Sequence, residues 1–182
     1  MALVLNGSGI TSANIADGTI VNADINSSAA IDGSKLTGAG KVLQVVQNIL
    51  PTGVTTSSTS YIDSGLSVTI TPTSATSKIL IMVNGGGHRI DTHDMQWYGT
   101  LFTGGSNIAN GLGGANDYLT CHYVYGASGG AYDFQWAESM SHLHSPATTS
   151  ATEYKYRVRV STGTLKWNIN GVTSMTVMEI GV

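Results

Sequence analysis

Residues 154–160 read YKYRVRV, and this stretch shows the periodicity that governs most of the chain. Its aromatic and apolar residues alternate with three basic ones: Tyr154, Tyr156, Val158 and Val160 against Lys155, Arg157 and Arg159. A period of two places successive side chains on opposite faces of a strand. The stretch therefore predicts a β-strand with one face in a core and the other face in water.

Two stretches upstream predict further strands. Leu66, Val68 and Ile70 alternate with serine and threonine, which again predicts a strand with one buried face. Residues 79–83, ILIMV, form a continuous apolar run that is too short for a helix and is followed by the three glycines 85–87. We expect this strand to be buried on both faces and to end at the glycines.

Four more strands are predicted between residue 119 and the C-terminus. Three alternate regularly and the fourth is a short apolar run: Leu119, Cys121, Tyr123 and Tyr125; Tyr132, Phe134, Trp136, Glu138, Met140, His142 and His144; Leu165, Trp167 and Ile169; and Met175 to Ile180. No stretch of a dozen residues has helical periodicity. Eight to ten short strands separated by glycine-rich turns predict an all-β protein, with a jelly-roll-like β-sandwich head over residues 41–182.

A different spacing occupies residues 1–40. Large aliphatic residues recur there at intervals of five or six: Ile10, Ile15, Ile20, Ile25, Ile31 and Leu36. This interval matches neither a helix nor a strand. Ordering each residue costs roughly 1–2 kcal/mol of backbone entropy, which one isolated isoleucine per five residues barely offsets. We therefore expect an extended stem that buries its aliphatic column against copies of itself, most simply in a homotrimer, or against a larger particle.

The bulk composition favours an exposed structural module over a metabolic enzyme. Only 10% of the 182 residues are charged, against roughly 25% in typical soluble domains. A net charge of −3 without a basic run argues against a nucleic-acid partner. Neither a signal peptide nor an apolar run of membrane-spanning length is present, so we expect synthesis in a cytoplasm and no membrane insertion. The single cysteine, Cys121, excludes an internal disulfide, and we expect it in the core.

Several stretches resemble the fibre and receptor-binding head proteins of tailed bacteriophages, especially those of cyanobacteria and marine bacteria. The similarity covers nearly the whole chain and is carried by residues 14–36 (NIADGTIVNADINSSAAIDGSKL), 40–47 (GKVLQVVQ), 60–87 (SYIDSGLSVTITPTSATSKILIMVNGGG), 145–160 (SPATTSATEYKYRVRV) and 175–182 (MTVMEIGV). The resemblance implies a homotrimeric virion fibre that is exposed on the released particle. Its stem would dock to other virion proteins, and its jelly-roll-like head would face the host surface.

Recognition of a host-surface glycan or outer-membrane component requires exposed rings and amides on loops. Such groups lie in or beside glycine-rich connectors, where rings can stack on sugars and amides can hydrogen-bond hydroxyls: Trp97, Tyr98, Asn107, Asn116 and Tyr118. The alternative for Trp97 and Tyr98 is a place in the core or in a trimer interface.

Patterns of catalysis and metal binding are weak in this chain. Residues 126–130, GASGG, satisfy G-x-S-x-G, but the helix that must follow a nucleophile elbow is absent from the pattern. His142 and His144 lie two residues apart and could share a metal at a trimer axis, or could be ordinary hydrogen-bonded histidines. We expect no catalytic residue, no cofactor and no metal.

The sequence leaves two positions on the particle open. In the first, the chain is a short tail fibre whose head binds the host. In the second, it is a capsid-mounted head fibre or a decoration protein that stabilises the shell.

Overall fold

The computed structural model describes residues 41–90, 94–109, 117–124 and 134–181. The stem predicted over residues 1–40 lies outside the described residues. The described residues contain no helix that is long and apolar enough to cross a membrane.

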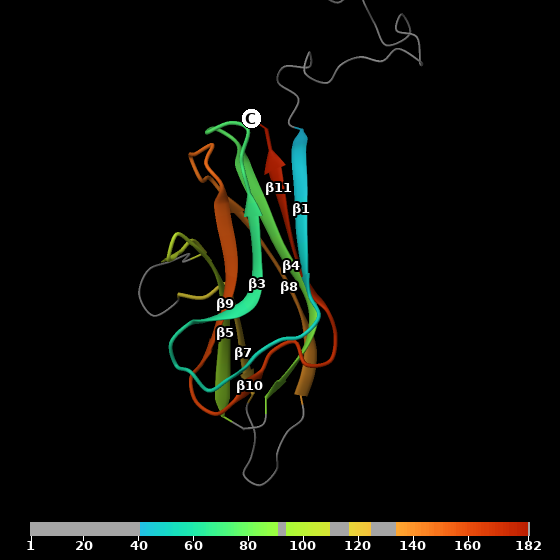
Figure 1. The fold of residues 1–182 in the computed structure, drawn as a ribbon. Helices are drawn as coiled ribbons and strands as arrows, with labels where there is room; N and C mark the ends of the chain where they lie inside the picture. The colour runs from blue at the N-terminus through green and yellow to red at the C-terminus, as the bar shows by residue number, and fades with distance from the viewer. Residues whose placement is uncertain (1–40, 91–93, 110–116, 125–133, 182) are drawn as a thin grey trace, which may run out of the picture. The chain divides into compact units, whose positions relative to one another are not determined.

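Two β-sheets face each other in the described part of the chain (Figure 1). The strands are β1 (Val42–Leu50), β2 (Thr55–Thr56), β3 (Ile62–Ile70), β4 (Lys78–Ile90), β5 (Met95–Thr103), β6 (Ser106–Asn107), β7 (Thr120–Val124), β8 (Phe134–His144), β9 (Thr152–Val160), β10 (Leu165–Lys166) and β11 (Thr173–Ile180). The fold class predicted from the sequence, all-β, is confirmed.

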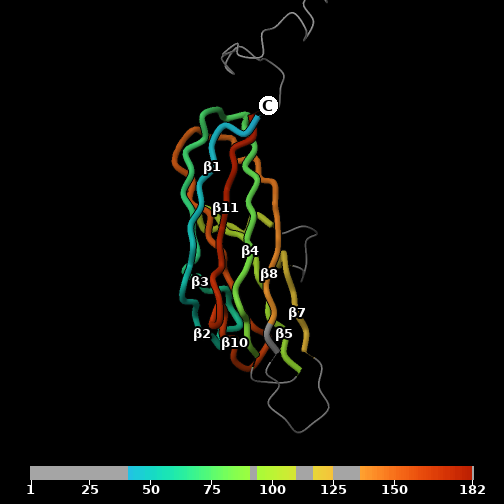
Figure 2. The backbone as a smooth tube through the Cα atoms, turned by 90° about the vertical axis from the view of Figure 1, so that its right-hand side faces the viewer, coloured from blue at the N-terminus to red at the C-terminus, as the bar shows by residue number. Residues whose placement is uncertain are grey.

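The order of the long strands is that of a jelly roll. We call β1-β11-β4-β8 the β4 sheet, which the short strands β10 and β2 extend, and β3-β9-β5-β7 the β9 sheet, which β6 extends. All pairs are antiparallel. Most successive long strands alternate between the two sheets. The view turned by 90° shows β1, β11, β4 and β8 side by side (Figure 2). The jelly-roll-like sandwich predicted for the head is therefore confirmed.

The stretch YKYRVRV forms most of β9, which lies between β3 and β5. Its tyrosines and valines are fully buried, while its basic residues are partly exposed on the outer face. The buried tyrosines and valines of β9 share one hydrophobic cluster with inward residues of the other sheet, including Ile79, Ile81, Val83, Met175 and Val177. Burying each such side chain contributes about 1.5–3 kcal/mol, so the alternation that defines the strand also defines the core.

The apolar run in β4 is buried on one face rather than on both. Ile79, Ile81 and Val83 point into the core, whereas Leu80 and Met82 are partly exposed on the outer face. The strand is central because β11 pairs with one edge and β8 with the other. The prediction of double burial was wrong because no layer of the described chain covers this outer face.

β4 also continues through the three glycines, where the prediction ended it. Gly85 and Gly86 have φ of +105° and +77°, and the register with β8 shifts between Gly85 and His88. A Cβ on Gly85 would lie 2.3 Å from the carbonyl oxygen of Val172. The glycines thus form a bulge, which bends a strand without ending it and reverses its side-chain parity. As a result, His88 and Ile90 point inward, although even-numbered residues before the bulge point outward.

The strand predicted over residues 165–169 is cut short after Leu165–Lys166. Asn168 has φ of +56°, and Ile169 is exposed rather than buried. The Asn168 side chain donates a hydrogen bond to the Leu50 carbonyl (2.7 Å) and accepts one from the Thr173 hydroxyl (3.0 Å). The long-range bond to Leu50 and the bond to Thr173 favour a left-handed turn over a continued strand, and the local alternation contains no sign of them.

Cys121 is exposed, which corrects the prediction that it lies in the core. It pairs with Tyr98 on the outer side of the β9 sheet, while its neighbour His122 turns inward against Trp97. The sequence predicted the alternation in β7 correctly, but it assigned the side of the strand that carries Cys121 to the core, and this side is the outer one. On β8, the residues from Trp136 to His144 were predicted to share one face. Glu138 and Met140 from this set are buried, so their side of the strand faces the core.

We predict that Gly85→Ala destabilises the head more than Gly104→Ala does. Both glycines have positive φ, but a Cβ at Gly104 meets nothing within 4 Å, whereas one at Gly85 meets backbone. Gly104→Ala should cost about 1 kcal/mol for the left-handed backbone alone, and Gly85→Ala should exceed it by at least about 1 kcal/mol. Urea unfolding of both variants measures the difference, and equal losses would contradict the bulge.

Candidate functional site

The outer face of the β9 sheet gathers aromatic and charged side chains. Register places Tyr98 beside Arg159 and Phe102 beside Lys155, while Asp63 lies beside Arg157 on the neighbouring strand. We call the surface formed by Tyr61, Tyr98, Phe102, Tyr118, Arg157 and Arg159 the tyrosine–arginine face.

Arg159 is the centre of one half of this face. Its guanidinium lies 3.9 Å from the ring centroid of Tyr98 and 5.1 Å from that of Tyr61. It also donates a hydrogen bond to an Asp117 carboxylate oxygen at 3.0 Å. The rings of Tyr98 and Tyr118 lie 5.0 Å apart at 46°. Cation–π and aromatic contacts therefore hold three rings around one guanidinium.

The loop that carries Asp117 is tied to the sheet through its backbone. The Tyr61 hydroxyl donates to the Asp117 carbonyl at 3.0 Å, and the Asn107 amide nitrogen donates to the same oxygen. The Asn107 amide oxygen in turn accepts from the Thr100 hydroxyl at 2.8 Å. Burial raises the pKa of Tyr61 to about 12, so this phenol stays protonated and keeps donating at neutral pH.

The other half of the face is a shallow hollow of about 160 Å³. It is lined by Phe102, Thr103, Gly104, Gly105, Glu153, Lys155 and Arg157. The Arg157 guanidinium lies 4.5 Å from the Phe102 ring centroid, and Lys155 makes ion pairs with Asp63 at 3.2 Å and Glu153 at 3.5 Å. Partial burial tends to raise the pKa of Asp63, but Lys155 and Arg157 hold it below its usual value. Two cations and two carboxylates leave the hollow without net charge.

The structure brings together only some of the residues predicted to bind a receptor. Tyr98 and Tyr118 meet on the tyrosine–arginine face. Trp97 is fully buried, so its assignment to binding is corrected to a place in the core, and Asn107 holds the 117 loop. Asn116 and the stem residues Ile10, Ile15, Ile20, Ile25, Ile31 and Leu36 lie outside the described residues.

Sequence reasoning missed Tyr61, Arg157 and Arg159 as members of the face. The alternation in β9 had already placed both arginines on the solvent side of their strand. Their position beside β5 and next to Tyr61 depends on strand order, which is a tertiary property.

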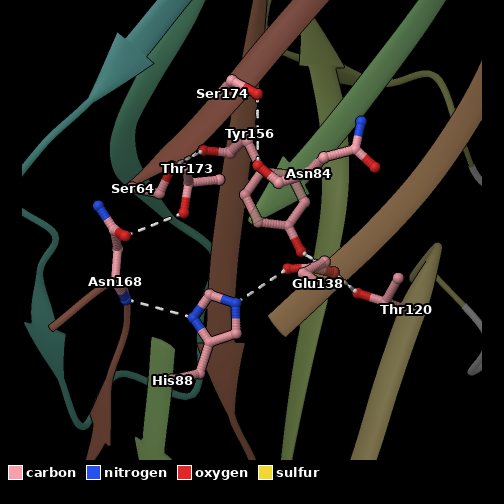
Figure 3. A network of polar contacts seen from close by, with 9 residues as sticks. All are labelled: Ser64, Asn84, His88, Thr120, Glu138, Tyr156, Asn168, Thr173 and Ser174. Atoms are coloured by element: carbon pink, nitrogen blue, oxygen red, sulfur yellow. Dashed lines mark hydrogen bonds and ion pairs between the residues drawn. The ribbon is translucent and has the colours of Figure 1, made fainter. Parts of the chain in front are cut away.

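A second polar cluster lies inside the sandwich, and Figure 3 shows it from close by. His88 from β4 and Glu138 from β8 point toward one another, with Nε2 and Oε2 3.7 Å apart. The other Glu138 oxygen accepts hydrogen bonds from the hydroxyls of Thr120 and Tyr156, both at 2.6 Å. The Asn168 backbone N–H donates to His88 Nδ1 at 3.2 Å, so the ring proton of neutral His88 lies on Nε2.

Aromatic rings surround this interior cluster. Ring centroids of Trp97 and Trp167 each lie 5.4 Å from that of His88, and Trp136 lies at 6.3 Å. Burial, with a smaller contribution from His122, lowers the pKa of His88 to about 4, and burial raises the pKa of Glu138. The His88 and Glu138 side chains are essentially inaccessible to solvent, so the cluster stabilises the interior and offers no entry for a substrate.

Of the paired histidines on β8, His144 is hydrogen-bonded within the chain, and the sharing of a metal across a trimer axis stays a prediction. His144 shares a hydrogen bond of 2.9 Å between Nδ1 and the Tyr154 hydroxyl. No group of three or more histidine, cysteine or carboxylate side chains in the described ranges could hold a metal ion.

No protein-family model matches this chain, and no curated protein sequence matches it. Solved structures of infectious bursal disease virus show a distant similarity. The T13 viral particle of IBDV aligns with a TM-score of 0.43 at 12% identity over 75% of this chain. The Gt strain aligns at 0.35 with 14% identity over 79%, and the Gx strain at 0.38 with 10% identity over 84%. The aligned parts cover 34%, 37% and 44% of those longer chains, and scores this low carry no inference about function.

We predict that acidification from pH 7.5 to 4.5 lowers the free energy of unfolding. The unfolded chain protonates His88 near its ordinary pKa of 6.5, whereas the folded chain does so near 4. Stability from this residue is complete above pH 6.5 and is lost as the pH falls toward 4, by up to about 3 kcal/mol. Burial likewise lowers the pKa values of His122, His142 and His144, which adds losses of the same sign.

The variant His88→Gln separates the contribution of His88 to the pH dependence of stability from the contributions of the other titrating groups. Glu138 has a raised pKa and acts in the opposite direction, destabilising the fold as the pH rises above 4.5. Urea unfolding at several pH values should show a shallower pH dependence for His88→Gln, while His142→Gln should keep most of the wild-type slope. A His88→Gln slope equal to that of the wild type would refute the assignment.

Proposed function

We propose that this chain is a non-enzymatic virion structural protein, the short tail fibre of a bacteriophage, whose head binds a glycan on the host surface. The observation that carries the proposal is the tyrosine–arginine face, a partly exposed surface of rings and guanidinium groups on a rigid sheet. The jelly-roll head and the aliphatic spacing in residues 1–40 also support it, because they suit a compact head on a self-associating stem.

The chemistry of the face suits a carbohydrate. Sugar rings present C–H faces that pack on aromatic rings, and hydroxyls that exchange hydrogen bonds with guanidinium and carboxylate groups. Tyr98 and Phe102 lie on one strand with Arg159 and Lys155 opposite them on the next, so rings and polar groups alternate along the surface. Because Asp63, Asp117 and Glu153 balance the nearby basic residues, the face favours hydroxyl-rich glycans over polyanions.

A shallow face of this kind binds weakly in each head, and repetition would supply the strength. Three heads on one homotrimeric fibre, and several fibres on one particle, raise the local concentration of binding faces near a polysaccharide. The expected partners are therefore other copies of the chain, further virion proteins through residues 1–40, and the host glycan.

We expect an antibody raised against the head to label the tail of intact particles in electron micrographs. Label on the tail supports the fibre assignment. Label over the shell would instead support a capsid-mounted head fibre or decoration protein, and particles without label would refute a virion role.

We predict that Tyr98→Ala and Arg159→Gln each weaken attachment of the fluorescently labelled full chain to host cells by about tenfold, or roughly 1.4 kcal/mol. Tyr98→Ala removes a ring, and Arg159→Gln removes the guanidinium that holds Tyr61 and Tyr98 together. Lys78→Gln is the matched control, since it removes one positive charge from an exposed position on the other sheet.

Periodate treatment of the cells gives the chemical control, because it cleaves the vicinal diols of glycans and leaves most protein receptors intact. Attachment that survives periodate, or that Tyr98→Ala leaves unchanged, would count against a glycan and against this face respectively.

A further inference from the structure

The outer face of the β4 sheet carries an apolar row that crosses the whole sheet. Register aligns Val45 on β1 with Met178 on β11, Met178 with Leu80 on β4, and Leu80 with Leu143 on β8. Four adjacent strands span roughly 15 Å at the usual strand spacing. We call this row, with Val42 at the start of β1, the apolar band.

The apolar side chains of the band are more exposed than valine and leucine side chains usually are. Val42, Val45 and Leu143 are 53%, 54% and 51% exposed, and Leu80 and Met178 are partly exposed. Around it, the outer face presents uncharged residues such as Gln47, Thr176, Ser141 and Ser139, with Lys78 at the start of β4. Arg89 and Lys166, which are also on this side of the sheet, lie at the other end of β4, away from the band. A continuous apolar strip in a surface region with so little charge is typical of an interface between subunits.

The two outer faces of the sandwich therefore differ in chemistry. The β9 sheet presents Lys155, Arg157 and Arg159 with their carboxylate partners. The core of an interface between subunits is depleted of charged residues, and the end of the β4 sheet that carries the band shows this depletion. This contrast assigns ligand contact to one side of the head and subunit contact to the other.

The position of the band in the chain identifies its occupant. Residues 1–40 join the head at Lys41, one residue before Val42 and four before Val45. At about 3.3 Å per residue in a strand, Val45 lies within roughly 13 Å of that junction. In the trimeric fibre proposed above, the chains associate through the segment that ends at this junction, so the head surface beside Lys41 is where neighbouring copies would approach one another.

We propose that the apolar band seats a second copy of this chain, so that the heads of the fibre pack against one another through the β4 sheet. The inference rests on the trimeric fibre of the proposed function and adds the surface by which its heads associate. The β4 sheets then lie around the axis, and the tyrosine–arginine faces point outward, where they are free to contact a host surface.

Cysteine cross-linking of the full chain tests the arrangement directly. Cys121 is replaced by serine, and Val45→Cys is introduced in that background, with Val172→Cys as the matched control. Val172 is also an exposed valine, at 52%, but lies outside the band. A short bismaleimide should join Val45→Cys chains to one another efficiently and Val172→Cys chains at least tenfold less. A trimer in which the two sites cross-link equally, or a monomeric wild-type chain, would overturn the proposal.

Charge insertion gives a second, independent measurement. Leu143→Glu places a carboxylate in the band, and Val172→Glu places one at equal exposure elsewhere. Sedimentation of the full chain should show that Leu143→Glu raises the concentration at which the assembly dissociates by at least tenfold, while Val172→Glu leaves it unchanged. Circular dichroism confirms that both variants are folded, and equal dissociation of the two would contradict the band.

Failure of this inference and failure of the proposed function give different results. If Val45→Cys cross-links but Tyr98→Ala leaves host attachment intact, the glycan proposal fails and the band stands. If Tyr98→Ala abolishes attachment while Val45→Cys does not cross-link a trimeric chain, the band fails and the glycan proposal stands.

Discussion

The packing of this head depends on the side-chain parity of its two central strands, β4 and β9. β9 keeps one parity over its length, so its tyrosines and valines all point inward. β4 reverses parity at the bulge formed by residues 85–87, where backbone from the 170–173 turn approaches too closely for any Cβ. The reversal points His88 into the interior, where Trp97 and Trp167 enclose it. One register shift thus decides that His88 lies in the part of the core that contains Trp97 and Trp167.

The interior holds a polar pair that hydrogen bonds satisfy only in part: among the described residues, His88 Nε2 and Glu138 Oε2 have no hydrogen-bond partner, while donors from other elements reach the remaining polar atom of each side chain. Thr120 and Tyr156 donate to Glu138, and the Asn168 backbone donates to His88. An isolated buried carboxylate would cost several kcal/mol, and each donor reduces that cost. Such a network favours one arrangement of β4, β7, β8 and β9, because a slip would break the hydrogen bonds that Glu138 and His88 do make. The network also makes the head sensitive to acid.

The outer surfaces follow from the same alternation. Lys155, Arg157 and Arg159 alternate with the buried tyrosines and valines of β9, and the two arginines meet aromatic side chains of β5 and of Tyr61, which precedes β3. The outward residues of β11 and of the first half of β4 are apolar or uncharged apart from Lys78, whereas Arg89 lies outward at the other end of β4. We propose that the first face contacts a hydroxylated ligand and the second a copy of the chain, as a fibre head would require.

Period-two alternation in the sequence alone determined the fold class, the strands β3, β4, β7, β8, β9 and β11 in outline, and the inward side of β9, because this pattern is local and has one meaning on a pleated strand. It missed β5, where Trp97 and Tyr98 were expected in or beside connecting loops but lie on a strand between β9 and β7. Tertiary structure alone decided that Trp97 is core, that Cys121 is exposed, and that the glycines of β4 bend rather than end it. Each of these depends on which strand lies alongside or opposite, and strand order is set by contacts far apart in the chain. The grouping of Tyr61, Tyr98 and Arg159 has the same origin, since β5, β9 and the residue before β3 supply one side chain each and only the pairing of these strands brings them together.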